Sequence, residues 1–569
     1  MVGRQFRISA ITTTREGLYM TKIWVKGLSV SLCAVMTATS LAACSGGKEA
    51  ASSENSGSGN APANAAGSGK LSEKEREVKV TFPEHPNQPV KNFALVQQEI
   101  FKQTNIKLKF ETVPNSNYND KKKTLLATNN LPDIIQIDMS DVNNFGSTGV
   151  FLPLLQYMNK GMMPNFKKFW DQYPDIMKLT ADGELYGFPA IGRNELKNGF
   201  GPVIRTDLLQ KHNLPVPKTF DELLTVLAEL KKLYPDSTPF SVRKGSGPIH
   251  QLFKTMAYPL GSGVGGGNGI YFDKDLNGGQ YVYGPATPQF KEVLGYFNKA
   301  FSMGVLDKDY AVATQQQWTE KLTSGKSFFF FDNSGFALDY TKQLQKAVPD
   351  GKFQIIPTPA NKTGQARAEF YATTLTDKMF AISSKAKDPE TLIKLLDWMY
   401  TEKASNLMSY GVEGVHHTLD EKGQPKLNAD YVMKFKDGQP TPFYAMYSDL
   451  GSGKLSFTPW FANMDPQVQV EKLTGSWSPV HEEYWKTIAD DKAYHDPYID
   501  PPLTKEEAAR VKEILAPLNT MLEQEYDKFI MGVKKIDEYD AVMKKARDTG
   551  GAELEKIYND ALARLKQKK

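Results

Sequence analysis

The sequence predicts an α/β fold built from two lobes, and three observations lead to this prediction. Short apolar segments typical of strands alternate with helical stretches in the first half of the folded region, which is the pattern of an α/β sheet. The segment 77–569 is too long to be organised around a single hydrophobic core. Capped helices with one apolar face follow toward the C-terminus.

The first lobe opens with a regular alternation of elements. The expected elements are, in order, a strand at 78–82, a helix at 92–104, a strand at 106–113, a short helix that ends at 129–130 and a strand at 133–137. The strand at 106–113 alternates apolar and polar residues, as a half-buried strand does. This order favours an α/β sheet over an all-helical or all-β lobe.

Later elements are marked by caps and by one unusually apolar run. Thr219 and Glu222 form a capping box at the start of a helix. The run 328–331 consists of four phenylalanines, which predicts a strand buried on both faces. Thr504 and Glu507 form a second capping box, and a long amphipathic helix follows it.

The N-terminal region carries a secretory signal. Lys22 and Lys26 precede a short apolar run at 27–40, and small residues follow it; this order is typical of a signal peptide. The run is too short to span a bilayer as a stable helix. We expect the signal to comprise residues 20–43, and we interpret residues 1–19 as a mis-assigned upstream start.

The signal ends in Leu-Ala-Ala-Cys at residues 41–44, which resembles the lipobox of bacterial lipoproteins. That resemblance implies a diacylglycerol on the sulfur of Cys44, cleavage before Cys44, and acylation of the new amino group, for example by palmitate. The protein would then be lipid-anchored on the extracellular face of the cell membrane, because burial of the acyl chains holds it there. An ordinary signal peptide with a chance cysteine is the alternative.

Cysteine content and charge exclude several classes of protein. The chain has two cysteines; Cys33 leaves with the signal and Cys44 is acylated, so neither a disulfide nor a cysteine-based metal site is expected. Five basic residues and one acidic residue precede Cys44, so the formal charge of +4 becomes neutral on maturation and does not indicate nucleic-acid binding. Residues 44–76 are rich in Ser, Gly and Ala, which predicts a disordered tether.

Several short motifs follow one another along the folded region. They are Leu-Pro-Asp-Ile at 131–134, Asp-Gly at 182–183, Tyr-Gly-Phe-Pro at 186–189, Arg-Thr-Asp-Leu-Leu at 205–209, Pro-Lys-Thr at 217–219 and Tyr-Gly-Val-Glu-Gly-Val-His at 410–416. In this order they resemble the solute-binding lipoproteins of carbohydrate ABC importers, specifically the large sugar-binding branch of Gram-positive bacteria. The resemblance implies a type II periplasmic-binding-protein fold: two α/β lobes, a hinge, and a ligand cleft between the lobes.

The resemblance also implies a function, partners and lobe boundaries. The protein would bind an oligosaccharide or sugar and deliver it to ABC permease membrane subunits, as a monomer without a cofactor. We expect lobe one to comprise residues 77–193 and 376–455, and lobe two residues 194–375 and 456–569. Many relatives carry a calcium-binding loop, but here the loop at 273–284 has Gly284 where the bidentate glutamate is required, so no metal site is predicted.

Candidate ligand contacts follow from the rule that ligands lie beyond the carboxyl ends of strands in open α/β sheets. Asp138 and Asp332 each follow a predicted strand, although each could equally be a cap or a turn residue. Arg193 could donate two hydrogen bonds to hydroxyls or to a uronic carboxylate, or form a surface ion pair. Three aromatic side chains could stack on a sugar or belong to the core: Trp318, Tyr371 and Trp460.

Two other functional classes compete with the transport hypothesis. An extracellular polysaccharide-degrading enzyme would need a pair of carboxylates beside the glycosidic bond, and the many acidic residues leave that alternative open. No Gly-x-Ser-x-Gly, His-Glu-x-x-His or phosphate-loop motif occurs. A peptide-binding or scaffold lipoprotein is the third class. We predict a protein that is not an enzyme.

Overall fold

A computed structural model of the protein divides the chain into two units, residues 1–67 and 68–569. It describes residues 70–567 with short gaps. The gaps are 86–87, 194–195, 198, 245–250, 264–268, 273, 275–278, 369–370, 373–374, 439–440, 452, 454–456, 463, 476 and 495–498. The predicted signal, Cys44 and most of the predicted tether therefore lie outside the described residues. Within the described residues, no helix combines the length and apolar character needed to cross a membrane.

The first lobe is built on a mixed sheet with the strand order β17-β6-β14-β5-β1-β3. The strands are β1 (Arg76–Thr81), β3 (Ile106–Phe110), β5 (Ile134–Asp138), β6 (Phe188–Gly192), β14 (Leu375–Ile382) and β17 (Trp460–Phe461). β1 lies parallel to β3 and β5, whereas β14 is antiparallel to β5 and β6. β17 extends the sheet by pairing in parallel with β6. The predicted strands at 78–82 and 133–137 thus lie inside this sheet, and the strand predicted at 106–113 forms its edge and ends at Phe110.

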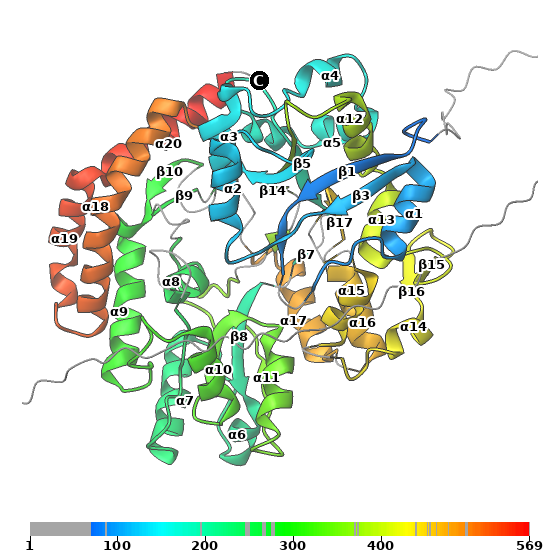
Figure 1. Cartoon of the computed structure of the whole chain (residues 1–569). Coiled ribbons are helices and arrows are strands. Elements are labelled where there is room, and N and C mark those ends of the chain that lie inside the picture. Colours follow the sequence, from blue (N-terminus) through cyan, green and yellow to red (C-terminus); the bar gives the residue numbers. More distant parts are fainter. Residues whose placement is uncertain are drawn as a thin grey trace, which may run out of the picture. The chain divides into compact units, whose positions relative to one another are not determined.

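Helices cover both faces of the first sheet (Figure 1). One face packs against α1 (Leu95–Thr104), α5 (Pro164–Gln172), α12 (Pro389–Trp398), α13 (Glu402–Tyr410), α14 (Ala429–Met433), α15 (Pro442–Leu450) and α16 (Met464–Leu473). The other face packs against α2 (Tyr118–Ala127) and α3 (Met139–Phe145). Alternation along β5 explains this, because Ile134 faces the first layer while Ile135 and Ile137 face the second.

The second lobe has a smaller antiparallel sheet with the order β11-β8-β12. The strands are β8 (Phe200–Arg205), β11 (Phe329–Asn333) and β12 (Phe353–Ile355). The predicted phenylalanine strand is confirmed: Phe329 and Phe331 face one core and Phe330 faces the other, each at most 2% exposed. Helices supply both layers, namely α6 (Thr206–Lys211), α7 (Phe220–Leu233), α8 (Gln251–Met256), α9 (Pro288–Ser302), α10 (Gln315–Thr323), α11 (Phe336–Leu344) and α17 (Pro479–Asp490).

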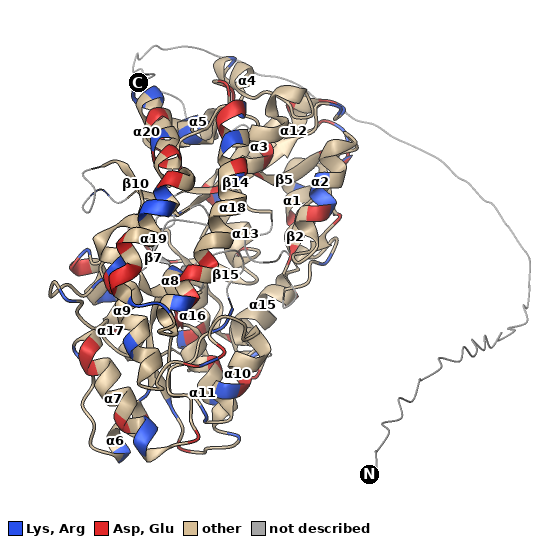
Figure 2. Cartoon of the chain, turned by 90° about the vertical axis from the view of Figure 1, so that its left-hand side faces the viewer, with Lys and Arg blue, Asp and Glu red and all other residues tan. Residues whose placement is uncertain are grey.

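The C-terminal helices complete the core of the second lobe. They are α18 (Lys505–Ile530), α19 (Tyr539–Ala546) and α20 (Ala552–Gln567). The predicted capping box at the start of α18 is confirmed, since the Glu507 N–H donates to Thr504 Oγ1 at 3.2 Å and the Thr504 N–H donates to Glu507 Oε2 at 2.9 Å. Along α20, basic and acidic residues are interspersed (Figure 2), and some form ion pairs such as Lys556–Asp560.

The other predicted capping box is only half formed. The Glu222 N–H donates to Thr219 Oγ1 at 3.1 Å, as expected. The Glu222 carboxylate, however, accepts from the Lys218 N–H at 2.7 Å rather than from the N–H of Thr219. The Lys218 N–H thus takes the place of the Thr219 N–H as the donor to this carboxylate.

Two predicted boundaries differ from the structure. The tether was expected to extend through residue 76, yet Leu71 packs against the first core, the Ser72 N–H donates to Thr104 O, and Arg76 begins β1. Lobe two was expected to begin again at residue 456, but Phe457 and Val470 belong to the core of the first sheet. These apolar side chains have their partners in the first lobe, so we propose that the crossing back to lobe two follows α16.

Short two-stranded ribbons accompany the main sheets. β7 (Leu196–Lys197) pairs with β13 (Tyr371–Ala372) in the two segments that run between the lobes. The others pair β2 (Pro83–Glu84) with β4 (Val113–Pro114), β9 (Ile270–Phe272) with β10 (Tyr281–Tyr283), and β15 (His417–Leu419) with β16 (Pro425–Leu427). The ribbon of β7 and β13 joins the two crossing segments by backbone hydrogen bonds.

Candidate functional site

Asp138 lies at the carboxyl end of β5, as predicted, where it caps α3 and pairs with a buried lysine. Its Oδ1 accepts from the Asp141 N–H at 3.2 Å. Lys122 Nζ lies 2.6 Å from Asp138 Oδ2 and 2.5 Å from Asp141 Oδ2, and the lysine side chain is 4% exposed. Burial alone would lower the pKa of Lys122, but its hydrogen bonds to the two carboxylates outweigh burial and raise it. Asp138 is therefore committed to a cap and an ion pair in this structure.

Arg193 and Trp460 are brought together by the pairing of β6 with β17. Ile191 lies opposite Trp460 in this pairing, and the Arg193 N–H donates to Phe461 O at 3.1 Å. The guanidinium carbon of Arg193 lies 4.7 Å from the centre of the Trp460 ring, a cation–π geometry. The tryptophan side chain is half-buried, so part of the ring remains accessible.

Two residues of α13 fix the orientation of Arg193. Its Nε donates to Ser405 Oγ at 3.0 Å, and its Nη2 donates to Asn406 Oδ1 at 2.7 Å. Phe169 contacts the Trp460 ring edge to face, with 5.1 Å between the ring centres. The two residues singled out separately in the sequence thus form one unit at the edge of the first sheet.

Asp332 lies at the carboxyl end of β11, as predicted, but its carboxylate is 1% exposed. It accepts two hydrogen bonds from Arg243, at 2.9 Å from Nε and 2.8 Å from Nη2. It also accepts from Gln251 Nε2 at 3.1 Å and from the Asn333 N–H at 2.7 Å. In this geometry Asp332 positions Arg243 rather than presenting an acceptor to a ligand.

Trp318 is fully buried in the core of the second lobe. It is 0% exposed, and its Nε1 donates to Ser241 O at 3.2 Å. Phe330 and Tyr340 contact its ring edge to face, each with 5.4 Å between the ring centres. Because no part of its surface is accessible, we do not include Trp318 among the proposed ligand contacts.

Arg243 was not identified from the sequence, although it is the accessible partner of Asp332. Its side chain is 27% exposed, and its guanidinium carbon lies 5.7 Å from the centres of both the Trp318 and the Phe336 rings. Burial alone would lower its pKa, but the hydrogen bonds to Asp332 outweigh burial and raise it. The side chain is therefore a fixed cation at the carboxyl end of β11.

The helix α17 lies across the carboxyl ends of β11 and β12. His481 Nε2 lies 3.1 Å from Ser334 O, directly after β11, and Tyr484 OH lies 2.8 Å from Thr358 Oγ1, shortly after β12. Trp477, which lies just before α17, and Trp485 within it are both half-buried, and their rings meet edge to face with 5.0 Å between their centres. The structure thus places an aromatic pair at the strand ends where a ligand is expected.

The sequence reasoning missed this pair, although a signal was available. His481 and Trp485 are spaced by four, which places them on one face of a helix, and Trp477 lies two residues before that helix begins. The Ser-Pro at 478–479 marks a helix start. Tyr371, by contrast, lies in β13 opposite Lys197, and its side-chain surroundings lie outside the described residues.

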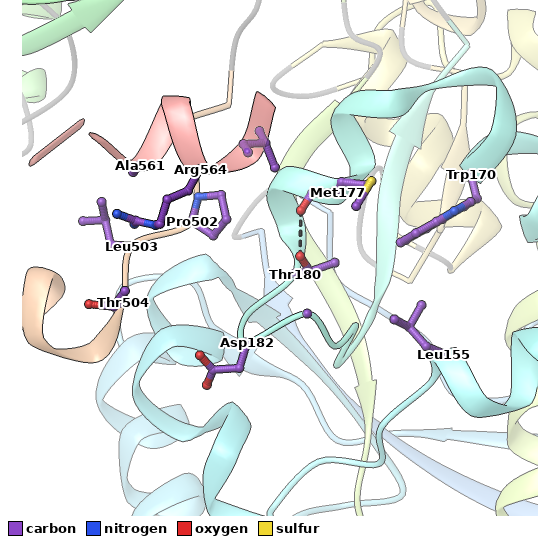
Figure 3. A pocket seen from close by; sticks show the side chains of 12 residues that line it. Leu155, Trp170, Met177, Thr180, Asp182, Pro502, Leu503, Thr504, Ala561 and Arg564 are labelled. Atoms are coloured by element: carbon purple, nitrogen blue, oxygen red, sulfur yellow. Dashed lines mark hydrogen bonds between the residues drawn. The ribbon is translucent and has the colours of Figure 1, made fainter. Parts of the chain in front are cut away.

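Figure 3 shows a pocket of about 130 Å³, and none of the six predicted contact residues lines it. The segment from α4 (Leu155–Asn159) to Gly183 forms one wall, and the start of α18 and the end of α20 form the other. Its lining residues are Leu155, Trp170, Met177, Thr180, Asp182, Gly183, Pro502, Leu503, Thr504, Ala561, Arg564 and Leu565. It is made of helix ends and turns rather than strand ends, so we do not assign the main ligand to it.

No group of three metal-ligating side chains occurs among the residues that the structure describes. In the predicted loop at 273–284, residues 273 and 275–278 lie outside the described residues.

The fold and the strand-end geometry define a class: a two-lobed α/β binding protein whose crossing segments join the lobes. Residues 88–406 match the family described as bacterial extracellular solute-binding protein, and the chain belongs to that family. It is similar to the polygalacturonan/rhamnogalacturonan-binding protein YtcQ of Bacillus subtilis, with 28% identity over 62% of this chain and 68% of the relative. It is also similar to the fructooligosaccharide ABC transporter substrate-binding protein FusA of Streptococcus pneumoniae, with 28% identity over 58% of this chain and 62% of the relative.

The chain spans 62% to 68% of the length of these relatives and of lipoprotein LipO of Bacillus subtilis. Among solved structures, it resembles the alginate-binding protein AlgQ2 with a TM-score of 0.67, 22% identity, and coverage of 86% of this chain and 99% of the other. It resembles FusA in complex with kestose with a TM-score of 0.63, 20% identity, and coverage of 87% and 100%. These structural likenesses confirm the predicted two-lobed fold.

Proposed function

We propose that this protein is the extracellular solute-binding subunit of an ABC importer, and that its solute is an oligosaccharide. The single observation that supports this most is the aromatic pair Trp477–Trp485 across the carboxyl ends of β11 and β12. Membership of the solute-binding family, and the saccharide names carried by YtcQ and FusA, support the same proposal.

The chemistry of the strand-end residues suits a sugar. A pyranose ring has apolar C–H faces that pack on indole rings, and hydroxyls on its edges that need fixed donors and acceptors. Trp477, Trp485 and Trp460 are half-buried aromatic side chains. Arg193 and Arg243 are each oriented by the hydrogen bonds that they donate to neighbouring side chains. A preorganised donor loses less entropy when it binds a hydroxyl.

We further propose that the chain is a lipoprotein attached through Cys44 and delivers its ligand to the permease as a monomer. The support is the lipobox resemblance and the Ser/Gly/Ala-rich segment that follows it. Expression of Cys44→Ser in cells fed a labelled fatty acid is the test. We expect no label and no normal processing; a labelled, processed variant would contradict the anchor.

The enzyme class is the main competitor, and one experiment separates it from transport. Purified protein is titrated calorimetrically with a panel of plant-derived and fructose-based oligosaccharides, and the recovered sugar is analysed by mass. We expect saturable binding of at least one saccharide and unchanged chain length. Shortened products would favour a polysaccharide-degrading enzyme, and binding of peptides alone would favour a peptide-binding or scaffold lipoprotein.

A further inference from the structure

We infer that the ligand is an acidic oligosaccharide, and that Arg243 and Lys254 in the second lobe bind its uronic carboxylate. This inference rests on the proposed function and names the class of its substrate. The support is the set of side chains at the edge of the second sheet where β8 begins and β11 ends.

The first cation, Arg243, has a free donor edge. Its Nε and Nη2 are held by the buried carboxylate of Asp332, while Nη1 has no hydrogen-bond acceptor among the described residues, and the side chain is 27% exposed. Phe336 lies beside the guanidinium plane, with 5.7 Å between the guanidinium carbon and the ring centre. A guanidinium fixed on one edge by a carboxylate offers its remaining N–H groups in a defined direction, which suits a planar anion.

The second cation, Lys254, lies at the same edge of the sheet. Its Nζ is 6.0 Å from the centre of the Phe200 ring, and Phe200 is the register partner of Asn333 in β8 and β11. The adjacent Asp332 accepts a hydrogen bond from Gln251, which lies one turn before Lys254 in α8. Asp332 therefore accepts hydrogen bonds both from Arg243 and from Gln251, and Gln251 belongs to the same helix as Lys254.

Asn333 adds a neutral donor at this edge. Its Oδ1 accepts from the Gly335 N–H at 3.0 Å, which leaves the amide NH₂ without a hydrogen-bond acceptor in the part of the chain that the structure describes. The hydroxyl and carboxylate oxygens of an acidic sugar accept hydrogen bonds from a donor of this kind.

The local charge favours an anion over a neutral sugar. Asp332 compensates one of the two cations, and the described residues form no ion pair with Lys254. This edge therefore carries an excess of one positive charge. A neutral sugar would remove water from these cations without supplying a counter-charge, which is unfavourable. A uronic carboxylate would instead accept charge-assisted hydrogen bonds from Arg243 and electrostatic support from Lys254.

The test compares an acid with its own ester. Trigalacturonate and its fully methyl-esterified form have the same rings and hydroxyls, and only the first carries carboxylates. Charge-assisted hydrogen bonds predict that the acid binds about tenfold to a hundredfold more tightly by calorimetry. The preference should shrink as salt concentration rises.

Two variants and one control test whether Arg243 and Lys254 cause the preference for the acid over its ester. Lys254→Gln should reduce the preference for the acid without changing the melting temperature, because the side chain is exposed. Arg243→Gln should abolish most of the preference; if it fails to fold because Asp332 is left buried and unpaired, Lys254→Gln still decides the question. Lys512→Gln, an exposed position on α18, should leave both affinities unchanged.

The outcomes separate the inference from the proposed function. Equal binding of acid and ester, or a preference that survives Lys254→Gln and Arg243→Gln, would overturn the inference and leave oligosaccharide binding intact. If neutral fructose-based oligosaccharides bind and neither galacturonate form does, the protein binds oligosaccharides but does not select acidic ones. If no saccharide in the panel binds, both the inference and the proposed function are wrong.

Discussion

Removal of the buried ammonium of Lys122 should destabilise the first lobe without weakening ligand binding. The lysine is 4% exposed and bridges Asp138 and Asp141 at 2.6 and 2.5 Å. In Lys122→Met the two carboxylates lose their common cation inside a partly buried site. Breaking a buried ion pair by removing one partner typically costs about 3–5 kcal/mol, so we expect a loss in the free energy of unfolding within that range at pH 7.

The pH dependence of the loss follows from the carboxylate of Asp141. Burial already raises the pKa of Asp141 above its usual value, and Lys122 opposes that shift. Without the lysine the folded-state pKa rises further, while the unfolded-state pKa is unchanged. The folded variant then binds protons more readily than the unfolded chain, so its stability should recover as the pH falls from 7 toward 4.

The assay is urea unfolding of wild type, Lys122→Met and the control Lys121→Met at pH 7 and pH 5. Lys121 is exposed on the same helix, so its replacement should change stability by less than about 0.5 kcal/mol. If both variants have the same free energy of unfolding, the ion pairs of Lys122 contribute nothing to the stability of the first lobe. If Lys122→Met folds but loses affinity for the sugar, Asp138 does contact the ligand, contrary to the structural role given above.

Three further predictions concern single side chains. Trp477→Ala should weaken sugar binding by about thirtyfold or more with little change in melting temperature. Trp318→Ala should instead lower the free energy of unfolding by about 3–5 kcal/mol. A loss of stability in Trp477→Ala and a loss of affinity alone in Trp318→Ala would show that Trp477 is the core residue and Trp318 the ligand contact. Asp397 accepts from the N–H groups of Asn165 and Phe166 at the start of α5, at 3.0 and 2.8 Å, so Asp397→Ala should lower the free energy of unfolding by about 1–3 kcal/mol, and an unchanged urea midpoint would contradict this. Burial lowers the pKa of His481 below its usual 6.5, so the unfolded chain takes up the proton first and stability should fall as the pH drops below about 6.5; His481→Asn should lose less stability between pH 7.5 and 5.5 than wild type does.

Local patterns predicted the elements that depend on neighbouring residues. The phenylalanine run at 328–331 fixed its own position, because four large apolar side chains can only be buried from both sides. The box of Thr504 and Glu507 likewise depends on hydrogen bonds that span three residues. Such features need no knowledge of the rest of the fold.

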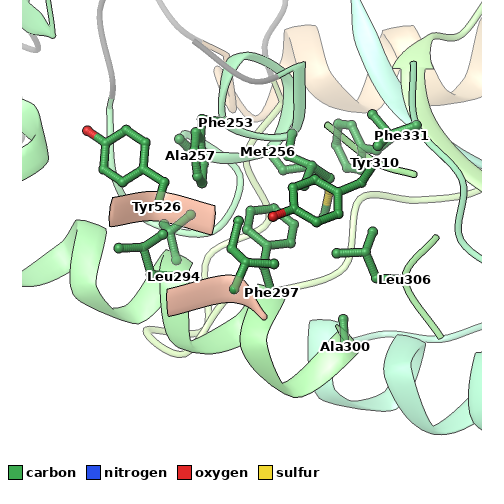
Figure 4. Packing of buried hydrophobic residues seen from close by; sticks show 14 of the residues in the cluster. Phe253, Met256, Ala257, Leu294, Phe297, Ala300, Leu306, Tyr310, Phe331 and Tyr526 are labelled. Carbon is green, nitrogen blue, oxygen red and sulfur yellow. The ribbon is translucent and has the colours of Figure 1, made fainter. Parts of the chain in front are cut away.

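Contacts between distant segments could not be predicted in this way. Asp332 was correctly placed at a strand end, but its partner Arg243 is 89 residues away, and nothing local distinguishes it from other arginines. In the core of the second lobe, Tyr526 of α18 packs on Phe253 of α8, with 5.1 Å between ring centres (Figure 4). The assignment of Phe457 to the first lobe depends on the same kind of long-range packing.

If the two lobes hold one oligosaccharide between them, the distance between the lobes should change when the sugar binds. Lys123 on α2 and Lys346 just after α11 are exposed, so Lys123→Cys and Lys346→Cys can carry a pair of spin labels, with Cys33 and Cys44 both replaced by serine. A ligand that contacts both lobes binds the closed form better and shifts the population toward it. We predict a shorter label-to-label distance at saturating trigalacturonate than in free protein; an unchanged distance, with binding confirmed in the same sample, would show that the lobes do not close on the sugar.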